Sequence, residues 1–368
     1  MRIIKKKLSE YAELTGYLHE LHDETDNIKE YPAIIIFPGG GFRMCSFLES
    51  EPIALAYLAE GYQAFTLKYT TVTDKEDATI EDPMSDAQKA LEWIRACREE
   101  YCIGEGKLAL LGFSGGAHLA AATATHGPQR PDVLLLGYPG ILHSELRALE
   151  CPDIVECIDE KTPPTFLFGT RDDKVTPPKH ILAFAQYLEQ KNVEFEVHIF
   201  RKGEHGFSLA KPLTSAGDKN RVNSDVAQWF QLSVRWLKEM LGEFTVYGVN
   251  DGRDGKYSID TRICELLKTP ETKAIVLTYL PMLDEELPVF VRDWLTPRKL
   301  NKNQKLLSQD KLEELDKRLL ELSFSTELPT KIIMKEAHGL SHELLLIKNI
   351  MSRQPLSQES RPAYLKSP

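Results

Sequence analysis

The stretch Leu110-Leu-Gly-Phe-Ser-Gly-Gly-Ala-His-Leu-Ala120 is the part of the sequence that best indicates the fold. An apolar run typical of a buried strand ends at Gly112, and an alanine-rich run typical of a helix begins at Ala117. The Gly-x-Ser-x-Gly pattern between them is typical of a tight turn that exposes a serine hydroxyl, with glycine where a side chain would clash. The pattern predicts Ser114 as a nucleophile, and its alternative role is that of a helix cap.

Two later motifs provide the groups that a serine nucleophile needs, a base for its proton and an acid that holds the base. A pair of aspartates follows the apolar run 165–169, and we expect Asp172 to be the acid, with Asp173 as the alternative. Gly-Glu-His-Gly follows the apolar run 193–200 and predicts His205 as the base. The order serine, aspartate, histidine is that of α/β-hydrolase triads.

A glycine-rich loop, Pro38-Gly-Gly-Gly-Phe42, follows the apolar run 33–37. Backbone N–H groups in such a loop can approach the negative charge that develops on a substrate carbonyl oxygen. We expect the amides of Gly40 and Gly41 to form this oxyanion hole together with the amide of Gly115. The sequence patterns of a nucleotide-binding loop are absent, and the sequence predicts neither a cofactor nor a metal site.

Short apolar runs alternate with longer amphipathic ones over the first two thirds of the chain, a pattern that indicates an α/β fold. We expect eight strands, at residues 3–8, 12–21, 33–37, 63–69, 107–111, 133–137, 165–169 and 193–200. Besides the helix after Ser114, we expect helices at residues 52–61, 82–101, 180–191 and 223–240. The first two strands alternate like an antiparallel hairpin, and the others predict a mostly parallel sheet flanked by helices.

The composition changes after Gly242, which indicates a second region. We predict a catalytic domain over 1–245, a Gly/Asp-rich linker over 246–257, a small mainly helical region over 258–351 and a disordered tail over 352–368. The helical region is interpreted as a packing or oligomerisation module, which leaves a homo-oligomer open.

The net charge limits the classes of partner that we expect, and the cysteines indicate the cellular compartment. The formal net charge of −10 argues against nucleic acids and anionic membranes as partners, and no apolar stretch is long enough to span a bilayer. The six cysteines lack paired spacing, and no signal peptide is recognised at the start of the chain. We therefore expect reduced thiols and a cytoplasmic protein.

Residues 31 to about 241 resemble the carbohydrate-esterase group of α/β-hydrolases, the acetylxylan- and feruloyl-esterase-like enzymes. The resemblance lies in five segments: Phe37-Pro-Gly-Gly-Gly-Phe42, Glu51-Pro-Ile-Ala-Leu-Ala56, Gly112-Phe-Ser-Gly-Gly116, Gly169-Thr-Arg-Asp-Asp-Lys-Val175 and Gly203-Glu-His-Gly-Phe207. In that family the first aspartate of the pair is the acid, which implies Asp172. Pro38 stands where lipase-like relatives carry histidine, which favours the sugar-esterase branch.

The resemblance implies an α/β-hydrolase fold and a serine esterase without cofactors. The expected substrate is a small-molecule ester of a short acyl group such as acetyl, with an acetylated oligosaccharide as one candidate. A prolyl-oligopeptidase-like peptidase is the alternative enzyme, and a non-catalytic scaffold protein is the alternative outside enzymes. We expect the segments 70–82 and 140–162 to determine the acyl length and the alcohol.

Overall fold

The computed structural model describes residues 1–22, 28–142, 148–151, 154–242, 245–246, 257–285, 291 and 295–322. The chain divides into two compact units, within residues 1–247 and within residues 248–368. Most of the predicted linker, the second part of the predicted helical region and the predicted tail lie outside the described residues.

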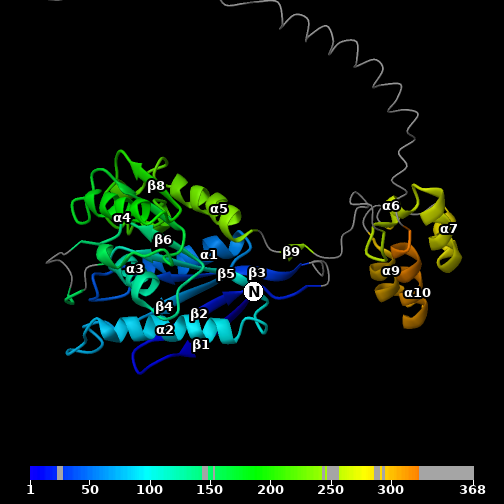
Figure 1. Cartoon of the computed structure of the whole chain (residues 1–368), viewed down its shortest axis with the longest axis horizontal. Helices are drawn as coiled ribbons and strands as arrows, with labels where there is room; N and C mark the ends of the chain where they lie inside the picture. Colours follow the sequence, from blue (N-terminus) through cyan, green and yellow to red (C-terminus); the bar gives the residue numbers. More distant parts are fainter. Residues whose placement is uncertain are drawn as a thin grey trace, which may run out of the picture. The chain divides into compact units, whose positions relative to one another are not determined.

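A nine-stranded sheet forms the centre of the first unit (Figure 1). Its main path runs in the order β1 (Arg2–Lys7), β2 (Glu13–Leu18), β4 (Gln63–Lys68), β3 (Ile28–Phe37), β5 (Ile103–Phe113), β6 (Val133–Gly137), β7 (Thr165–Thr170) and β8 (Phe195–Phe200). β2 is antiparallel to both of its neighbours, and the remaining pairs along this path are parallel. The eight predicted strands are confirmed, and the short β9 (Thr245–Val246), which pairs with β3, is an addition.

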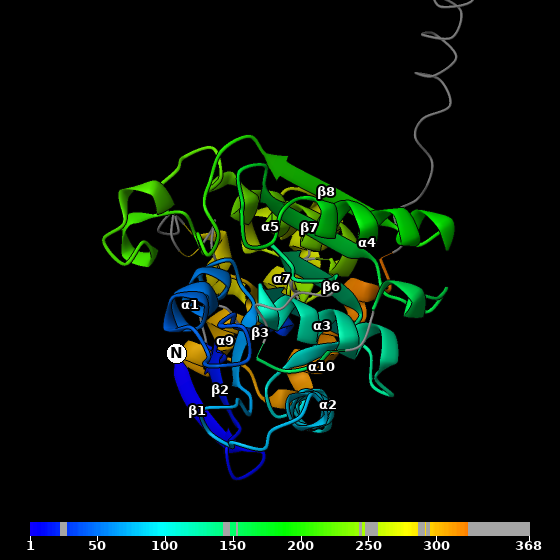
Figure 2. The same ribbon diagram turned by 90° about the vertical axis from the view of Figure 1, so that its left-hand side faces the viewer.

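Helices cover both faces of this sheet (Figure 2). On one face lie α2 (Glu81–Ala96), α3 (Gly115–His126) and α4 (Lys179–Gln190), whose apolar residues pack in one core cluster. On the other face lie α1 (Glu51–Ala59) and α5 (Gln228–Leu241), which belong to a second cluster. This arrangement confirms the predicted α/β class.

The two central strands show why the sheet is covered on both sides. Along β3, Ile35 packs in the core cluster of one face and Ile34 in that of the other, and both are fully buried. Along β5, Leu110 packs in the first of these clusters and Leu111 in the second. Alternate side chains of a strand point to opposite faces, so an uninterrupted apolar run fits a strand that is buried on both. The carboxyl ends of these strands bring the glycine loop and Ser114 to one edge.

Several element boundaries differ from the prediction: β3 and β5 begin earlier than expected, and two helices are shorter. The helix expected over 82–101 ends at Ala96, and the chain enters β5 at Ile103 after Cys102, whose φ of 53° is incompatible with a continuing helix. The helix expected from residue 223 begins at Gln228. None of these shifts moves a predicted site residue to another element.

The second unit has its own small apolar core. Its described helices are α6 (Ile263–Leu266), α7 (Pro270–Tyr279), α9 (Pro297–Gln304) and α10 (Gln309–Leu320). Leucines spaced along α10 pack with residues of α6 and α7 in a single cluster. The side chains of Thr296 and Ser308 cap α9 and α10 by accepting hydrogen bonds from backbone N–H groups. Nowhere in the described ranges is a helix both long and apolar enough to cross a membrane.

Candidate active site

Ser114 lies between β5 and α3 in a backbone conformation that only surrounding contacts can maintain. Its φ is 52° and its ψ is −117°, a region that residues other than glycine rarely adopt. A Cβ atom added at Gly112 would lie 2.4 Å from the carbonyl oxygen of Gly116. A Cβ atom added at Gly116 would lie 2.3 Å from the carbonyl oxygens of Phe37 and Pro38. Because these neighbours are backbone atoms, both glycines of the motif are required by steric fit.

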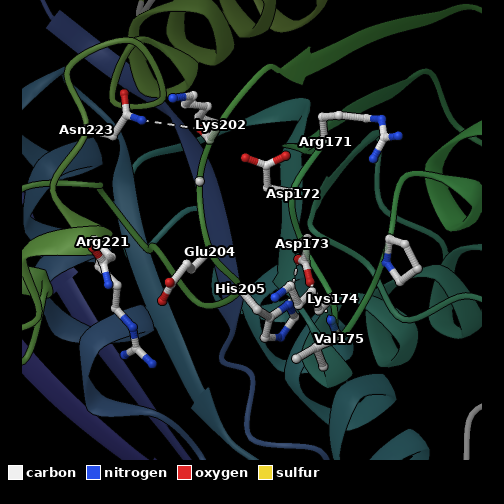
Figure 3. A pocket seen from close by; sticks show the side chains of 13 residues that line it. Arg171, Asp172, Asp173, Lys174, Val175, Lys202, Glu204, His205, Arg221 and Asn223 are labelled. Carbon is white, nitrogen blue, oxygen red and sulfur yellow. Dashed lines mark hydrogen bonds and ion pairs between the residues drawn. The ribbon is translucent and has the colours of Figure 1, made fainter.

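Ser114 begins a continuous chain of hydrogen bonds. Its Oγ lies 2.8 Å from His205 Nε2, and His205 Nδ1 lies 2.7 Å from Asp173 Oδ2. Asp173 is buried, whereas Asp172 is exposed and makes no contact with the histidine (Figure 3). The prediction of Asp172 as the partner of His205 is therefore wrong, and the alternative, Asp173, takes this place.

The turn after β7 explains which aspartate faces inward. Asp173 Oδ1 accepts the backbone N–H groups of Val175 and Thr176, both at 2.8 Å, which leaves Oδ2 for His205. This turn directs the carboxylate of Asp173 toward the sheet edge, while Asp172, one residue earlier, points to solvent.

Asp173 retains its charge in spite of its burial. Burial by itself raises the pKa of this carboxyl, but the hydrogen bond and the charge attraction of His205, with the amides of Thr176 and Val175, outweigh it. The pKa of Asp173 therefore falls below its ordinary value of 3.8. An ionised carboxylate accepts a hydrogen bond from Nδ1–H of His205 and leaves Nε2 to interact with Ser114.

The glycine loop lies against the turn that carries Ser114. Gly40 and Gly41 have φ values of 132° and 59°, and a Cβ atom added at Gly115 would lie 3.1 Å from the nitrogen of Gly41. None of the amides of Gly40, Gly41 and Gly115 donates a hydrogen bond to another described residue. All three predicted oxyanion glycines line, together with Ser114, a cavity of about 360 Å³.

A buried carboxyl beneath this loop was not predicted. Glu49 Oε2 accepts the N–H of Gly39 at 2.7 Å, and Glu49 Oε1 accepts the hydroxyl of Tyr138. Burial raises the pKa of Glu49, although its hydrogen bonds with Tyr138 and Gly39 and its attraction to His205 oppose the rise. The Tyr138 ring also packs edge-on against His205, with 5.1 Å between ring centroids. Glu49 is not part of a recognisable sequence motif. The only relation to the glycine loop that the sequence shows is that Glu49 follows Gly39 by ten residues.

A second, larger cavity of about 940 Å³ adjoins the first and is shown in Figure 3. Val175, His205 and Arg221 line both cavities. Charged side chains from the turns after β7 and β8 and from a later loop surround the larger one: Arg171, Asp172, Lys174, Lys202, Glu204 and Arg221.

The segments expected to shape the site contribute unequally. Residues 70–82, all of which are described, line neither cavity. From 140–162, Gly140 lines the smaller cavity and the N–H of Ala148 donates to the carbonyl of Gly41 at 3.0 Å, while 143–147 and 152–153 lie outside the described residues. The loop with Arg221 was not expected at the site.

Other polar residues have structural surroundings. His118 is fully buried, and its Nδ1 lies 2.9 Å from the carbonyl oxygen of Gly140, so this histidine is a packed, hydrogen-bonded residue of the core. None of the six cysteines forms a disulfide bond with another described residue. Within the described ranges, no three His, Cys, Asp or Glu side chains are grouped closely enough to hold a metal ion.

Comparisons with known proteins place this geometry among hydrolases. Residues 20–132 match the BD-FAE family model. An α/β-hydrolase enzyme from a Medee basin deep-sea metagenome library is 38% identical, with a TM-score of 0.61 over 66% of this chain and 98% of that chain. The acetyl ester-xyloside bifunctional hydrolase of Caldicellulosiruptor lactoaceticus is 31% identical, with a TM-score of 0.54 over 63% of this chain and 89% of its own.

A curated relative is much longer than the matched region. Endo-1,4-beta-xylanase B of Butyrivibrio fibrisolvens is 29% identical over 226 residues, which are 54% of this chain. The chain spans only 35% of the length of that xylanase.

Proposed function

The chain belongs to the α/β-hydrolase family of enzymes, and we propose that it is a serine carboxylesterase that removes a short acyl group, such as acetyl, from a sugar or another small alcohol. The observation that carries the proposal is the hydrogen-bonded chain Ser114–His205–Asp173. At its serine end, the same cavity is lined by the three predicted oxyanion glycines, whose amides donate no hydrogen bond to another described residue. This combination provides a nucleophile, a base, an acid and oxyanion donors in one place.

In the proposed acylation step, Ser114 Oγ attacks the ester carbonyl carbon while His205 Nε2 takes the hydroxyl proton. Asp173 stabilises the imidazolium that forms, because its lowered pKa keeps the carboxylate charged. The carbonyl oxygen becomes negative and receives hydrogen bonds from the amides of Gly40, Gly41 and Gly115. The bond from the carbonyl carbon to the alcohol oxygen then breaks, and His205 gives its proton to the departing alcohol.

The acyl group is then released by water. His205 takes a proton from a water molecule, whose oxygen attacks the acyl carbon within the same set of amides. The bond between that carbon and Ser114 Oγ breaks, and the proton returns to the serine. One water is consumed, and one alcohol and one carboxylic acid are formed.

Two observations support a short acyl group and a sugar-like alcohol. The cavity around Ser114 measures about 360 Å³ and includes the buried carboxyl of Glu49, a polar wall that disfavours a long apolar chain. Among the similar proteins, one is an acetyl ester-xyloside bifunctional hydrolase, and another is an endo-1,4-beta-xylanase.

The test is hydrolysis of p-nitrophenyl acetate, butyrate and octanoate and of an acetanilide by the wild type, Ser114→Ala and the control Ser85→Ala. Ser85 is exposed on α2, outside both cavities. We expect cleavage of the acetate, a decline with chain length and a loss of at least about 10³-fold in Ser114→Ala alone. Equal rates in Ser114→Ala would contradict the proposal, and faster cleavage of the anilide than of the esters would support a peptidase instead.

A further inference from the structure

The larger cavity beside the candidate active site is rich in cations for a chain with a net charge of −10. Apart from Asp173, which His205 engages, two carboxylates line the cavity, those of Asp172 and Glu204. Four cationic side chains line it as well: Arg171, Lys174, Lys202 and Arg221. Such a concentration of positive charge favours an anionic ligand.

The position of the cavity identifies the half of the substrate that it faces. His205 lines both cavities, whereas Ser114 and the oxyanion glycines line only the smaller one. In the proposed reaction the histidine gives its proton to the departing alcohol, so the alcohol lies on the side of His205. The basic cavity is therefore on the leaving-group side.

Arg221 is the cation best placed to act there. It lines both cavities, and Figure 3 shows its side chain on the same side of the larger cavity as Glu204, across from Asp172. Its Nε is buried without a hydrogen-bond partner, and the nearest carboxylate with which it pairs, that of Asp218, is 3.9 Å away.

The other cations of the cavity are also not neutralised by close ion pairs. Arg171, Lys174 and Lys202 are exposed and form no ion pair with another described residue. A guanidinium presents a planar set of donors that matches a carboxylate, and neighbouring lysines add charge without fixed geometry. The cavity thus offers one directional donor group and additional positive charge.

We propose that this cavity is a leaving-group subsite for an alcohol that carries a carboxylate, such as a uronic acid unit, with Arg221 as the residue that binds the carboxylate. The inference rests on the proposed ester hydrolysis and names the substrate class that it favours. The enzyme then prefers acetyl esters of acidic sugars to those of neutral sugars.

The test compares 4-acetoxybenzoate with its neutral amide, 4-acetoxybenzamide. The measured quantity is the ratio of their kcat/KM values, and comparing this ratio between variants cancels the intrinsic reactivity of the two esters. We expect Arg221→Gln to lower the ratio about tenfold, Arg221→Glu to lower it further, and 0.5 M NaCl to reduce the wild-type preference. Lys202→Gln tests the cavity independently of Arg221, with an expected decrease of about threefold. Lys89→Gln, an exposed charge change on α2 outside both cavities, is the control for which we expect an unchanged ratio.

The same measurements separate the two proposals. Suppose that the acetyl ester of 4-acetoxybenzamide is hydrolysed in a Ser114-dependent way but that neither Arg221→Gln nor Lys202→Gln changes the ratio. The subsite is then refuted, and the esterase proposal stands. If the acetyl ester of neither 4-acetoxybenzoate nor 4-acetoxybenzamide is hydrolysed, the proposed function fails. A preference for p-nitrophenyl hemisuccinate over p-nitrophenyl butyrate that disappears in Arg221→Gln would place the carboxylate on the acyl half and overturn the leaving-group assignment.

Discussion

The turn after β5 and the turn after β7 both bring one side chain to the same edge of the sheet, but different contacts determine their geometry. At the first turn, backbone atoms of the glycine loop and of α3 approach so closely that Gly112 and Gly116 have no room for a Cβ. At the second turn, the carboxylate of Asp173 itself accepts the two amides that shape the turn. The first turn therefore depends on the absence of side chains, and the second on the presence of one.

This difference predicts how each turn responds to substitution. A change at a glycine of the first turn has to move backbone, so it affects folding before it affects chemistry. A change at the aspartate of the second turn leaves the sheet packed and removes a charge and its hydrogen bonds, so it affects catalysis first.

The matched pair Asp173→Asn and Asp172→Asn is the strongest test of the second turn. We expect Asp173→Asn to lower kcat for p-nitrophenyl acetate by about 10⁴-fold, because an amide cannot hold the histidine in the required tautomer as a carboxylate does. We expect Asp172→Asn to remain within about threefold of the wild type, because its side chain is exposed. A large loss in the second variant and a small one in the first would contradict the orientation of this turn.

The pair Gly116→Ala and Gly115→Ala tests the first turn. The new Cβ at position 116 would lie 2.3 Å from two carbonyl oxygens, and we expect a loss of about 4 kcal/mol in the free energy of unfolding or no soluble protein. At position 115 the nearest atoms are at 3.1 Å, and we expect a loss of about 1 kcal/mol. Urea denaturation measures both, and equal losses would refute the steric account.

Glu49 allows the two turns to be compared with the glycine loop after β3. Gly39 N–H and Tyr138 O–H both donate to this carboxyl, and glutamine offers only one acceptor oxygen. We expect Glu49→Gln to lower kcat about tenfold and Glu49→Ala about 10²-fold, with KM changed little. Glu51→Gln on α1 is the control, because Glu51 also accepts a tyrosine hydroxyl, that of Tyr17 at 2.9 Å, outside the site. Equal effects at both positions would exclude a specific role for Glu49.

The smallest expected effect is on the pH dependence of stability. The folded-state pKa of Asp173 is lowered, so its contribution to stability is present above its unfolded-state pKa and is lost as the pH falls through the folded value, below 3.8. We expect the difference in urea midpoint between the wild type and Asp173→Asn to shrink as the pH falls below about 4. A difference that grows toward low pH would reverse the sign and contradict the lowered pKa.

The same difference, between steric fit and hydrogen bonds made by a side chain, determined how much of the fold and the site could be predicted from the sequence. The continuous apolar runs of β3 and β5 and the glycines around Ser114 were predictable, because burial on both faces and steric exclusion restrict residue types. His205 was predictable from its neighbouring glycines and its place after β8. The choice between Asp172 and Asp173 depended on a one-residue register within a turn, which residue types alone do not reveal.

Residues that act through long-range contacts had no local pattern. Glu49 is one glutamate among several charged residues near α1, and its importance arises only when Tyr138, 89 positions later, meets it in the fold. Arg221 belongs to a loop without periodicity, and only the cavity that it lines connects it to His205. The boundaries and role of the region after residue 245 remain predictions.

The segment from Gly39 to Glu49 closes on itself, and this has a consequence for protein engineering. Gly39 donates its N–H to Glu49 and accepts the N–H of Ser46 at 2.9 Å, while Gly40 accepts that of Arg43 at 3.0 Å. These three hydrogen bonds are thus encoded within eleven consecutive residues. A chimeric enzyme that exchanges this segment as one cassette, with a tyrosine retained at position 138, should keep its oxyanion geometry, whereas crossovers placed between residues 40 and 48 should lose it.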